Sequence, residues 1–561
     1  MTKEMLIVGA GPAGTTAALQ SRKLDKGAKV TLLTEESYPE YSRCGLPYVV
    51  SGVVSSLESL ISHPPEFYER TSRIKLMLHT RAYEIDPDEK VVSARNLKTG
   101  NEDSLHYDSL ILACGGRPVL PPIRGLDREG VFTVRTIEDI RSLLDHLKVV
   151  TVKTAVIIGG GLVGMEMSEA LLKKGLKVTL VEVLPEILQG LLDPDMAAII
   201  RERAEQAGVK ILTDAVIEEI LGGESVRGVK VSSTGEIETE TIVIAAKVKP
   251  NVDLAERTGV RIGNTGAIDV DEYMRTSIED IYAAGDCVET HDVVTGRRTL
   301  IQLATTAVRQ GLVAGANAVG GHERYLGSTG VCATELFGIE VASAGLTTRF
   351  ASDVGMPPIS ARVSAPVRPT YFPSCKSCIV KLLSNRQDER LIGVQIIGEE
   401  GVSERANLVA HAIHMRQDVK EFAKMETCYA PPVASIWDPL FVATQALTRK
   451  LEAEFNKRLE RLALEIPVHF RSVAADKLVD ILINSPNVKR MPNEVVKRIL
   501  FNWQRGALAT EYGLQVLLDA ALALEPEQTM NMLSNGLRLY APVLELKETK
   551  IPTQPRLLYN F

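Results

Sequence analysis

The sequence lacks a regular cysteine framework, a long apolar run and an excess of positive charge. Seven cysteines, an odd number, are scattered over 561 residues, which is typical of a reducing compartment and not of a disulfide-stabilised secreted protein. No stretch reaches the roughly 18 consecutive apolar residues of a membrane helix, and no signal peptide precedes the first predicted strand. The net charge of −7 argues against nucleic-acid binding. We therefore expect a soluble cytoplasmic protein with no membrane span.

The chain is long enough for three or four domains, at about 100–200 residues each, and two of its segments resemble each other. In each segment an apolar strand leads through a G-x-G-x-x-G turn into a helix and then into a second strand. The turns are Gly9-Ala10-Gly11-Pro12-Ala13-Gly14 and Gly159-Gly160-Gly161-Leu162-Val163-Gly164. Because the motif requires this context, the sequence predicts an α/β protein with two dinucleotide-binding domains.

The three glycines of each turn have separate tasks. The first permits the tight turn, the second lets the backbone approach a pyrophosphate, and the third lets the helix pack on the strand. The amino end of the helix then offers unpaired N–H groups and a positive dipole to the phosphates.

An acidic residue follows the second strand of each segment. Glu182 lies 18 residues after Gly164, where a carboxylate accepts hydrogen bonds from a ribose 2′-OH and repels a 2′-phosphate. NADH is therefore favoured over NADPH at the second site, and no arginine follows at once to reverse that choice. At the first site the stretch is Thr34-Glu35-Glu36, and we choose Glu35 for the ribose.

The pattern changes after Gly330, where short apolar runs alternate with one helical stretch. This part predicts a separate α+β domain, with strands at Glu340–Ala344, Cys378–Leu383 and Leu391–Ile397 and a helix at Ser403–Met415. From about Trp437 the chain is mostly helical. The helices expected there are Ala443–Leu462, Ala474–Ile483, Asn493–Asn502 and Thr510–Leu524, before an extended tail at Lys550–Phe561.

Three further motifs carry a family resemblance. They are Leu112–Pro118 (LACGGRP), Ala283–Asp286 (AAGD) and Tyr41–Tyr48 (YSRCGLPY). With the two glycine turns, they make about residues 1–450 resemble the pyridine nucleotide–disulfide oxidoreductases. The third motif is similar to the single-cysteine branch, which contains coenzyme A disulfide reductases, NAD(P)H persulfide and sulfur reductases, NADH oxidases and NADH peroxidases.

The resemblance implies a glutathione reductase-like architecture with FAD at the first turn and NAD(P)H at the second. The implied divisions are 1–150 and 271–330 for FAD, 151–270 for NAD(P)H, 331–450 for dimerisation, and 451–561 for a mainly helical extension. Asp286 is expected at the ribityl–phosphate region of the flavin, Leu303–Gly311 below its ring, and Glu166 near the nicotinamide. The other residues expected at FAD are Arg43, Ala113, Gly115, Gly285, Ala304 and Ala307.

Cys44 is the redox-active candidate. The C-x-x-x-x-C pair of glutathione reductase-like enzymes is absent, because the residue five after Cys44 is Val49. A lone cysteine must instead hold a sulfenate, a persulfide or a mixed disulfide with a small thiol.

The resemblance also bears on what Cys44 reduces. Peroxidases and oxidases of this branch usually carry a histidine where this sequence has Pro12. The stretch Ser21–Asp25 resembles coenzyme A disulfide and persulfide reductases, where Arg22 and Lys23 would pair with coenzyme A phosphates or, alternatively, form a solvated helix end. Tyr371 and Tyr429 resemble active-site tyrosines that reach the cysteine of the partner subunit in a homodimer, although tyrosines also simply pack at interfaces.

Other cysteines give weaker indications. Cys375 and Cys378 form one C-x-x-C without a second pair, so we expect no metal site and leave a redox dithiol open. Cys114 is interpreted as packing near FAD. The last ~110 residues contain no cysteine, which excludes a persulfide-forming rhodanese domain and leaves a protein partner as one role for this extension.

Three functions therefore stay open. The first is an NADH-dependent flavoenzyme that reduces a small disulfide, persulfide or polysulfide, with coenzyme A as a candidate carrier. The second is an NADH oxidase or peroxidase, which Pro12 disfavours. The third is an electron-transfer subunit whose C-terminal helices dock a protein partner.

Overall fold

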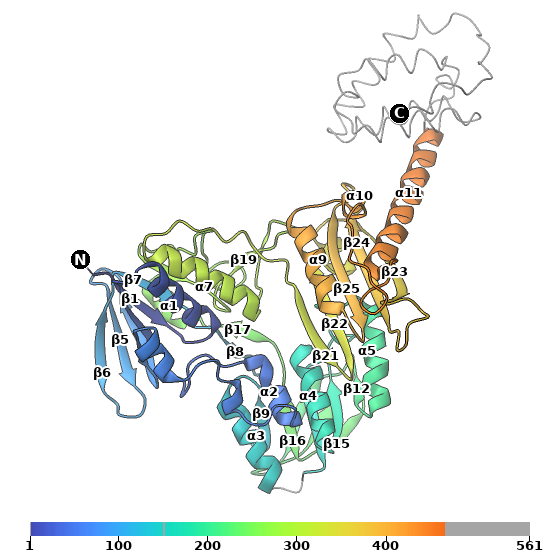
Figure 1. Ribbon diagram of the computed structural model, residues 1–561. Coiled ribbons are helices and arrows are strands. Elements are labelled where there is room, and N and C mark those ends of the chain that lie inside the picture. Colours follow the sequence, from blue (N-terminus) through green and yellow to red (C-terminus); the bar gives the residue numbers. More distant parts are fainter. Residues whose placement is uncertain (1, 150–151, 466–561) are drawn as a thin grey trace, which may run out of the picture. The chain divides into compact units, whose positions relative to one another are not determined.

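The computed structural model describes residues 2–149 and 152–465 (Figure 1). The chain divides into two units, Met1–Thr448 and Arg449–Phe561, and each is considered by itself. The last described helix is α11 (Pro439–Glu465), where Ala443–Leu462 was predicted. The other predicted C-terminal helices and the extended tail lie outside the described residues.

The first sheet is parallel and has the strand order β18-β7-β1-β2-β3. Its central strands are apolar and buried, as expected when helices cover both faces of a parallel sheet. The bounds are β1 (Glu4–Val8), β2 (Lys29–Leu33), β3 (Ile74–Met77), β7 (Ser109–Leu112) and β18 (Ile281–Ala283). Strand β18 therefore joins a sheet whose other members all precede residue 113.

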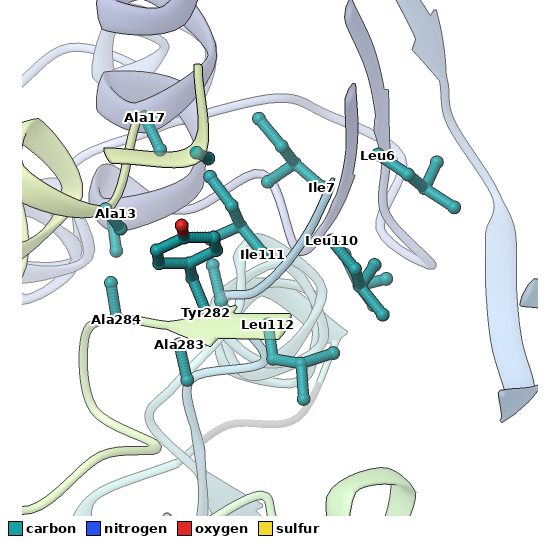
Figure 2. Close-up of a cluster of buried hydrophobic side chains, with 14 of the residues drawn as sticks. Leu6, Ile7, Ala13, Ala17, Leu110, Ile111, Leu112, Tyr282, Ala283 and Ala284 are labelled. Carbon is teal, nitrogen blue, oxygen red and sulfur yellow. The ribbon is translucent and has the colours of Figure 1, made fainter. Parts of the chain in front are cut away.

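Helices α1 (Pro12–Leu24) and α7 (Ala304–Ala318) lie side by side next to this sheet (Figure 1). Their contact is close because α7 presents glycines to α1. A Cβ added at Gly311 or Gly315 would lie 2.4 Å from the backbone oxygen of Ala13 or Ala17, respectively. Figure 2 shows the adjoining core, where Ile7 of β1, Ile111 of β7 and Tyr282 of β18 lie on the side of the sheet toward α1, and Leu6 lies on the far side.

The second sheet repeats this design with the parallel order β12-β11-β10-β16-β9. Its strands are β9 (Val131–Thr133), β10 (Thr154–Ile158), β11 (Lys177–Val181), β12 (Lys210–Leu212) and β16 (Thr241–Ile244). The helices of this part are α3 (Ile137–Val149), α4 (Leu162–Lys173) and α5 (Pro194–Ala207).

The third sheet is antiparallel, with the order β21-β22-β25-β24-β23. Helix α9 (Val402–His414) packs on β22 and β25. The strands are β21 (Cys332–Leu336), β22 (Ile339–Gly345), β23 (Pro358–Pro366), β24 (Ser377–Asn385) and β25 (Leu391–Gly398). This agrees with the predicted α+β domain after Gly330.

One hydrophobic core joins the segment after Cys44, the second sheet region and the antiparallel sheet. It contains Leu46 and Val50 of α2 (Leu46–Ser51), Met165 of α4, and Leu336 and Val341 from the antiparallel sheet. Because these residues share one close-packed interior, the segment after Cys44, the second nucleotide-binding region and the antiparallel sheet are held in a defined relation.

An ion cluster around the buried Lys381 adds to this junction. Lys381 of β24 is only 7% exposed and binds Asp193 at 2.8 Å and Asp195 at 2.5 Å, both at the start of α5. The Asp193 carboxylate also accepts hydrogen bonds from the backbone N–H and hydroxyl of Thr348. The second sheet region is therefore tied to the antiparallel sheet by charge as well as by apolar packing.

The described residues also form smaller elements. One three-stranded sheet contains β4 (Thr80–Asp86), β5 (Val91–Asn96) and β6 (Glu102–His106). Another contains β13 (Ile217–Gly222), β14 (Val226–Val231) and β15 (Gly235–Glu238). The two-stranded pairs are β8 (Gly116–Pro118) with β17 (Val248–Pro250), and β19 (Thr290–His291) with β20 (Arg298–Thr299). The remaining helices are α6 (Asp253–Thr258), α8 (Thr348–Asp353), α10 (Val419–Phe422) and the short turns Arg43–Gly45, Glu58–Leu60 and Phe67–Thr71.

Short segments near residues 150 and 270 pass from one sheet region to the other. Strand β9, which precedes residue 150, pairs with β16 of the second sheet. Strand β17 and Leu254 of α6, which precede residue 270, belong instead with β8 and the first core. The chain thus passes between the first and second sheet regions through β9, β17 and α6. None of these elements belongs to a glycine-turn motif, so the sequence pattern did not mark them.

Candidate active site

The first glycine turn opens onto a cavity of about 1280 Å³. The cavity is built from the carboxyl ends of β1, β2 and β7, the amino ends of α1 and α7, and the loop after β18. Of the predicted site residues, those that line it are Gly9, Gly11, Pro12, Ala13, Glu35, Arg43, Cys44, Ala113, Gly115, Gly285, Asp286, Ala304 and Ala307.

The glycines of this turn behave as the motif predicts. Gly9 has a φ of +109°, and a Cβ there would lie 2.1 Å from the oxygen of Ala113. A Cβ at Gly14 would lie 1.8 Å from the oxygen of Gly9, whereas one at Gly11 would meet no atom within 4 Å. The open side of Gly11, next to the amino end of α1, therefore fits the close approach of a pyrophosphate.

The second turn repeats this geometry. A Cβ at Gly164 would lie 1.8 Å from the oxygen of Gly159, and one at Gly161 would meet nothing within 4 Å. Helix α4 begins directly afterwards, at Leu162 and Val163. Glu182 is 8% exposed and accepts hydrogen bonds from the backbone N–H groups of Gly160 at 2.5 Å and Leu184 at 2.8 Å.

The acidic residues of the first turn have different partners. Glu35 forms an exposed ion pair with Arg81 at 2.6 Å. Glu36 is less exposed, and its two oxygens accept from Arg43 at 2.5 Å and from the Tyr41 hydroxyl at 2.6 Å. Glu36 is thus occupied in positioning the turn before Cys44, which leaves Glu35 as the better candidate for a ribose, and that role stays a prediction.

Five arginines at the cavity were missed by sequence reasoning. Arg135 binds Asp286 at 2.8 Å, Arg81 binds Glu35, and Arg117 binds Asp253 at 2.8 Å. The other two, Arg257 and Arg309, are exposed at the cavity wall. Arg117 lies within the recognised LACGGRP motif, whereas no motif marks the others. Because the other three pair with carboxylates, Arg257 and Arg309 are the arginines best suited to bind the phosphates of a dinucleotide.

Cys44 lies in the 3-10 turn Arg43–Gly45, on the cavity wall. The residue is exposed toward the cavity, but surrounding protein atoms still reduce its hydration. This partial burial, with the carboxylates of Glu166 and Asp286, raises the pKa of the Cys44 thiol, and the nearby guanidinium of Arg135 opposes the effect.

Glu166, on the first turns of α4, accepts a hydrogen bond of 2.7 Å from the hydroxyl of Thr334 on β21. Burial raises the pKa of Glu166, although the Thr334 hydrogen bond opposes this shift. The second nucleotide-binding region and the antiparallel sheet therefore meet at a carboxylate close to Cys44.

The two predicted tyrosines lie together, away from this cavity. Tyr371 is 73% exposed and Tyr429 is 49% exposed. The Tyr371 hydroxyl donates a hydrogen bond to Tyr429, and this bond raises the pKa of Tyr371. Neither tyrosine lines the cavity that holds Cys44, and their reach to the cysteine of a partner subunit stays a prediction.

The predicted phosphate ligands lie in the last turn of α1. Arg22 already donates hydrogen bonds to the backbone oxygens of Ser72, Lys26 and Ala28, so much of its guanidinium holds the local chain. Lys23 is exposed. Neither lines the cavity, and a role for them at coenzyme A stays a prediction.

The remaining cysteines differ from Cys44 in their surroundings. Cys378 is buried in β24, and burial raises its pKa to about 12. The Cys375 thiol donates to the oxygen of Arg368. Cys114 lines the cavity, where burial raises its pKa well above the ordinary value, and its electrostatic neighbours are Cys287 and Glu35. Cys114 therefore lies at a different part of the cavity from Cys44.

Comparison with known proteins agrees with this arrangement. Residues 3–311 match the family model described as pyridine nucleotide-disulphide oxidoreductase. The chain belongs to this family. Residues 331–439 match the dimerisation domain of the same family, which includes the antiparallel sheet. As a pyridine nucleotide-disulphide oxidoreductase, the protein is an NAD(P)H-dependent flavin enzyme with the predicted glutathione reductase-like fold.

Two relatives and one solved structure illustrate the range of the family. A protein of Methanocaldococcus jannaschii named NADH oxidase is 38% identical over 80% of this chain and 99% of its own. An NAD(P)H coenzyme A polysulfide/persulfide reductase of Pyrococcus horikoshii is 34% identical with the same coverage. The structure of an NAD-dependent persulfide reductase from A. fulgidus has a TM-score of 0.78 and 32% identity, covering 80% of this chain and 84% of that one.

Two negative observations apply to residues 2–149 and 152–465. No helix there is both long and apolar enough to cross a bilayer. In the same residues, no group of three or more His, Cys, Asp or Glu side chains is arranged to hold a metal ion.

Proposed function

We propose that this oxidoreductase uses NADH to reduce a low-molecular-weight disulfide, persulfide or polysulfide through Cys44, with a coenzyme A disulfide or persulfide as the candidate substrate. The observation that carries the proposal is the thiol of Cys44 on the wall of the dinucleotide cavity, with Val49 where a second redox cysteine would otherwise follow. The persulfide reductases among the relatives support the same chemistry.

Separate groups of residues would bind the two cofactors and position Cys44. The first turn, Glu35 and Asp286 would hold FAD, and the second turn with Glu182 would hold NADH. Bound FAD would supply two-electron transfer between NADH and sulfur. Arg43, fixed by Glu36 and Tyr41, keeps the turn that carries Cys44 in place against the cavity.

The sulfur step is a thiol–disulfide exchange. The thiolate of Cys44 attacks one sulfur of R–S–S–R′, which forms Cys44–S–S–R and releases R′–S⁻. Two electrons from NADH and a proton then split the mixed disulfide, so that RSH leaves and the Cys44 thiolate returns. For a persulfide, R–S–S–H, the group released in the first step is HS⁻.

We further propose that the active site is shared between two subunits. The dimerisation domain and the hydrogen-bonded, exposed pair Tyr371 and Tyr429 support this arrangement. A phenol of the partner subunit would donate a proton to the leaving thiolate. Lys23, with the part of Arg22 that holds no carbonyl, would pair with phosphates of coenzyme A.

An NADH oxidase is the second candidate, because a 38% identical relative carries that name. In this alternative, O₂ would take two electrons supplied by NADH and become hydrogen peroxide. The Cys44 thiolate would then attack the peroxide, take one oxygen as a sulfenic acid and release hydroxide. Pro12, at the position where oxidases and peroxidases of the branch usually have histidine, argues against it.

Anaerobic turnover separates the two candidates. NADH oxidation is followed at 340 nm with coenzyme A disulfide, coenzyme A persulfide or polysulfide, for the wild type, Cys44→Ser and Cys428→Ser. Cys428 is a matched control because it is also an exposed, unpaired cysteine. We expect sulfur-dependent turnover that Cys44→Ser abolishes and Cys428→Ser keeps. Turnover with O₂ alone, or sulfur turnover unaffected by Cys44→Ser, would contradict the proposal.

A further inference from the structure

One wall of the cavity at the first glycine turn comes from the segment that follows β17. We call residues 251–257 the strap. Its residues Asn251, Asp253, Leu254 and Arg257 line the cavity. Leu254 is only 8% exposed and belongs to the first hydrophobic core. The strap is therefore packed onto the first sheet region by its apolar side chains, and its polar side chains lie at the cavity.

The strap lies at the end of the cavity that holds Glu35. Helix α6, which forms most of the strap, packs against β4. Arg81 of β4 pairs with Glu35 at 2.6 Å, and the next two residues of β4, Ala82 and Tyr83, also line the cavity. An acidic residue at the end of the second strand of such a turn binds the ribose of adenosine. The strap thus borders the part of the cavity that is suited to the adenosine half of FAD.

Arg117 of β8 holds the strap in this place. Its guanidinium donates to Oδ1 of Asn251 at 2.7 Å and to Oδ1 of Asp253 at 2.9 Å. Asn251 in turn donates from its side chain to the backbone oxygen of Cys114 at 2.9 Å. The backbone N–H of Asn251 donates to the oxygen of Gly115 at the same distance. Because Cys114 and Gly115 line the cavity as well, these bonds attach the strap directly to the opposite wall.

The bonds of Arg117 have a local effect. The side chains of Arg117 and Asp253 are 37% and 60% exposed, and an ion pair this exposed adds little to the free energy of unfolding of the whole protein. A guanidinium presents its N–H donors in a fixed planar fork, so one side chain serves both the amide of Asn251 and the carboxylate of Asp253. Loss of Arg117 would therefore release the polar side of the strap without disturbing the core below it.

We propose that Arg117 is a positioning residue for FAD, which holds the strap over the adenosine half of the cofactor and so limits the rate of FAD release. Release at this end of the cavity requires the strap to move outward, and this movement breaks the bonds of Arg117 to Asn251 and Asp253. The inference goes beyond the proposed function, because it depends on FAD at the first turn and not on the identity of the sulfur substrate.

The test measures FAD exchange from the full-length, FAD-loaded protein. An excess of isotopically labelled FAD is added, and the label in the bound fraction is measured by mass spectrometry after rapid gel filtration at successive times. Arg117→Met keeps most of the apolar side chain and removes every donor, so it should exchange FAD at least about fivefold faster than the wild type. Arg117→Lys keeps the charge but lacks the fork, and its rate should lie between the two.

Arg324→Met is the matched control. Arg324 is also a half-exposed arginine that pairs with one carboxylate, that of Glu272, but neither residue lines the cavity. Its FAD exchange should proceed at the wild-type rate. An unchanged rate in Arg117→Met, or an equal acceleration in Arg324→Met, would overturn the proposal.

Urea unfolding separates a role at FAD from a general loss of stability. Flavin-free Arg117→Met should unfold at nearly the wild-type urea concentration. With FAD present it should unfold at a lower concentration than the wild type, because a bound ligand stabilises the folded state in proportion to its affinity. An equal decrease with and without FAD would assign Arg117 a merely structural role and would refute the proposal. Since neither assay contains NADH or a sulfur compound, failure here leaves the reduction through Cys44 unaffected.

Discussion

Replacing Gly11 and Gly14 separately by alanine should separate cofactor binding from folding within one turn. Gly11 has an extended backbone (φ −79°, ψ −174°) that alanine adopts easily, and its added Cβ would meet no protein atom within 4 Å. The cost to the free energy of unfolding is then the weaker helix cap, below about 1 kcal/mol. The methyl group would, however, occupy the side of the turn that fits a pyrophosphate.

Gly14 is the opposite case. Its added Cβ would lie 1.8 Å from the oxygen of Gly9, against the 3.0 Å below which real Cβ contacts essentially never occur. The difference, 3.0 − 1.8 = 1.2 Å, is the least that α1 must move away from the turn. The atoms that the added Cβ would meet are the backbone oxygen and carbon of Gly9, which cannot rotate away. This overpacking should therefore lower the free energy of unfolding by about 1–3 kcal/mol or more.

Two measurements test this pair. Urea unfolding of flavin-free protein, followed by circular dichroism, gives the stability, and FAD titration gives the affinity. Gly11→Ala should unfold nearly as the wild type but bind FAD at least about tenfold more weakly, whereas Gly14→Ala should lose both. Wild-type FAD affinity in Gly11→Ala, or wild-type stability in Gly14→Ala, would refute the reasoning. Gly161→Ala and Gly164→Ala repeat the comparison for NADH, with the same contacts.

Three further predictions concern charged side chains. Lys381→Met leaves the buried carboxylate of Asp193 without its cation and should lower the free energy of unfolding by about 3 kcal/mol. Arg95→Met removes an exposed pair with Glu102 and should change the free energy of unfolding by less than about 1 kcal/mol in the same urea titration. Burial alone would raise the pKa of Asp193, but its hydrogen bond with Lys381 and its other bonds outweigh burial and hold the pKa below the ordinary value. The lowered pKa of Asp193 therefore contributes to the free energy of unfolding above the unfolded pKa, and this contribution is lost as the pH falls below about 4. Over an acid titration, Asp193→Asn should lose less stability than the wild type. Equal losses in the two proteins would contradict this. Glu182→Ala should raise the KM for NADH at least about tenfold and narrow the preference over NADPH, and unchanged kinetics with both nucleotides would exclude the assigned role.

The features that sequence reasoning predicted correctly are those encoded within short stretches. A glycine turn between an apolar strand and a helix is a local pattern. The strand predicted at Leu391–Ile397 differs from the observed β25 (Leu391–Gly398) by one residue. The fold and family were confirmed for the same reason, because each motif marks one recurring unit. The helix predicted at Ser403–Met415 likewise differs by one residue at each end.

The features that were not predicted depend on contacts between distant segments. Arg135 lies 151 residues before Asp286, with which it pairs, and no spacing in the sequence connects them. Arg22 is the opposite case. Its charge in the sequence indicates a phosphate ligand, but in the fold its guanidinium donates hydrogen bonds to three backbone oxygens. Thr334 beside Glu166 is a third example, because two domains must be packed before they meet.

The late strand β18 has a consequence for biosynthesis. The first sheet has four of its strands complete at Leu112, but β18 starts only at Ile281 and α7, which covers α1, ends at Ala318. At a translation rate of about 5–20 residues per second, the interval between Leu112 and Ile281 lasts about 10–30 s. During that time the edge of β7 is unpaired on the nascent chain, while all strands of the second sheet are synthesised. Vectorial folding on the ribosome is therefore expected to complete the NADH-binding region first, and FAD can be captured only after the return segment has emerged.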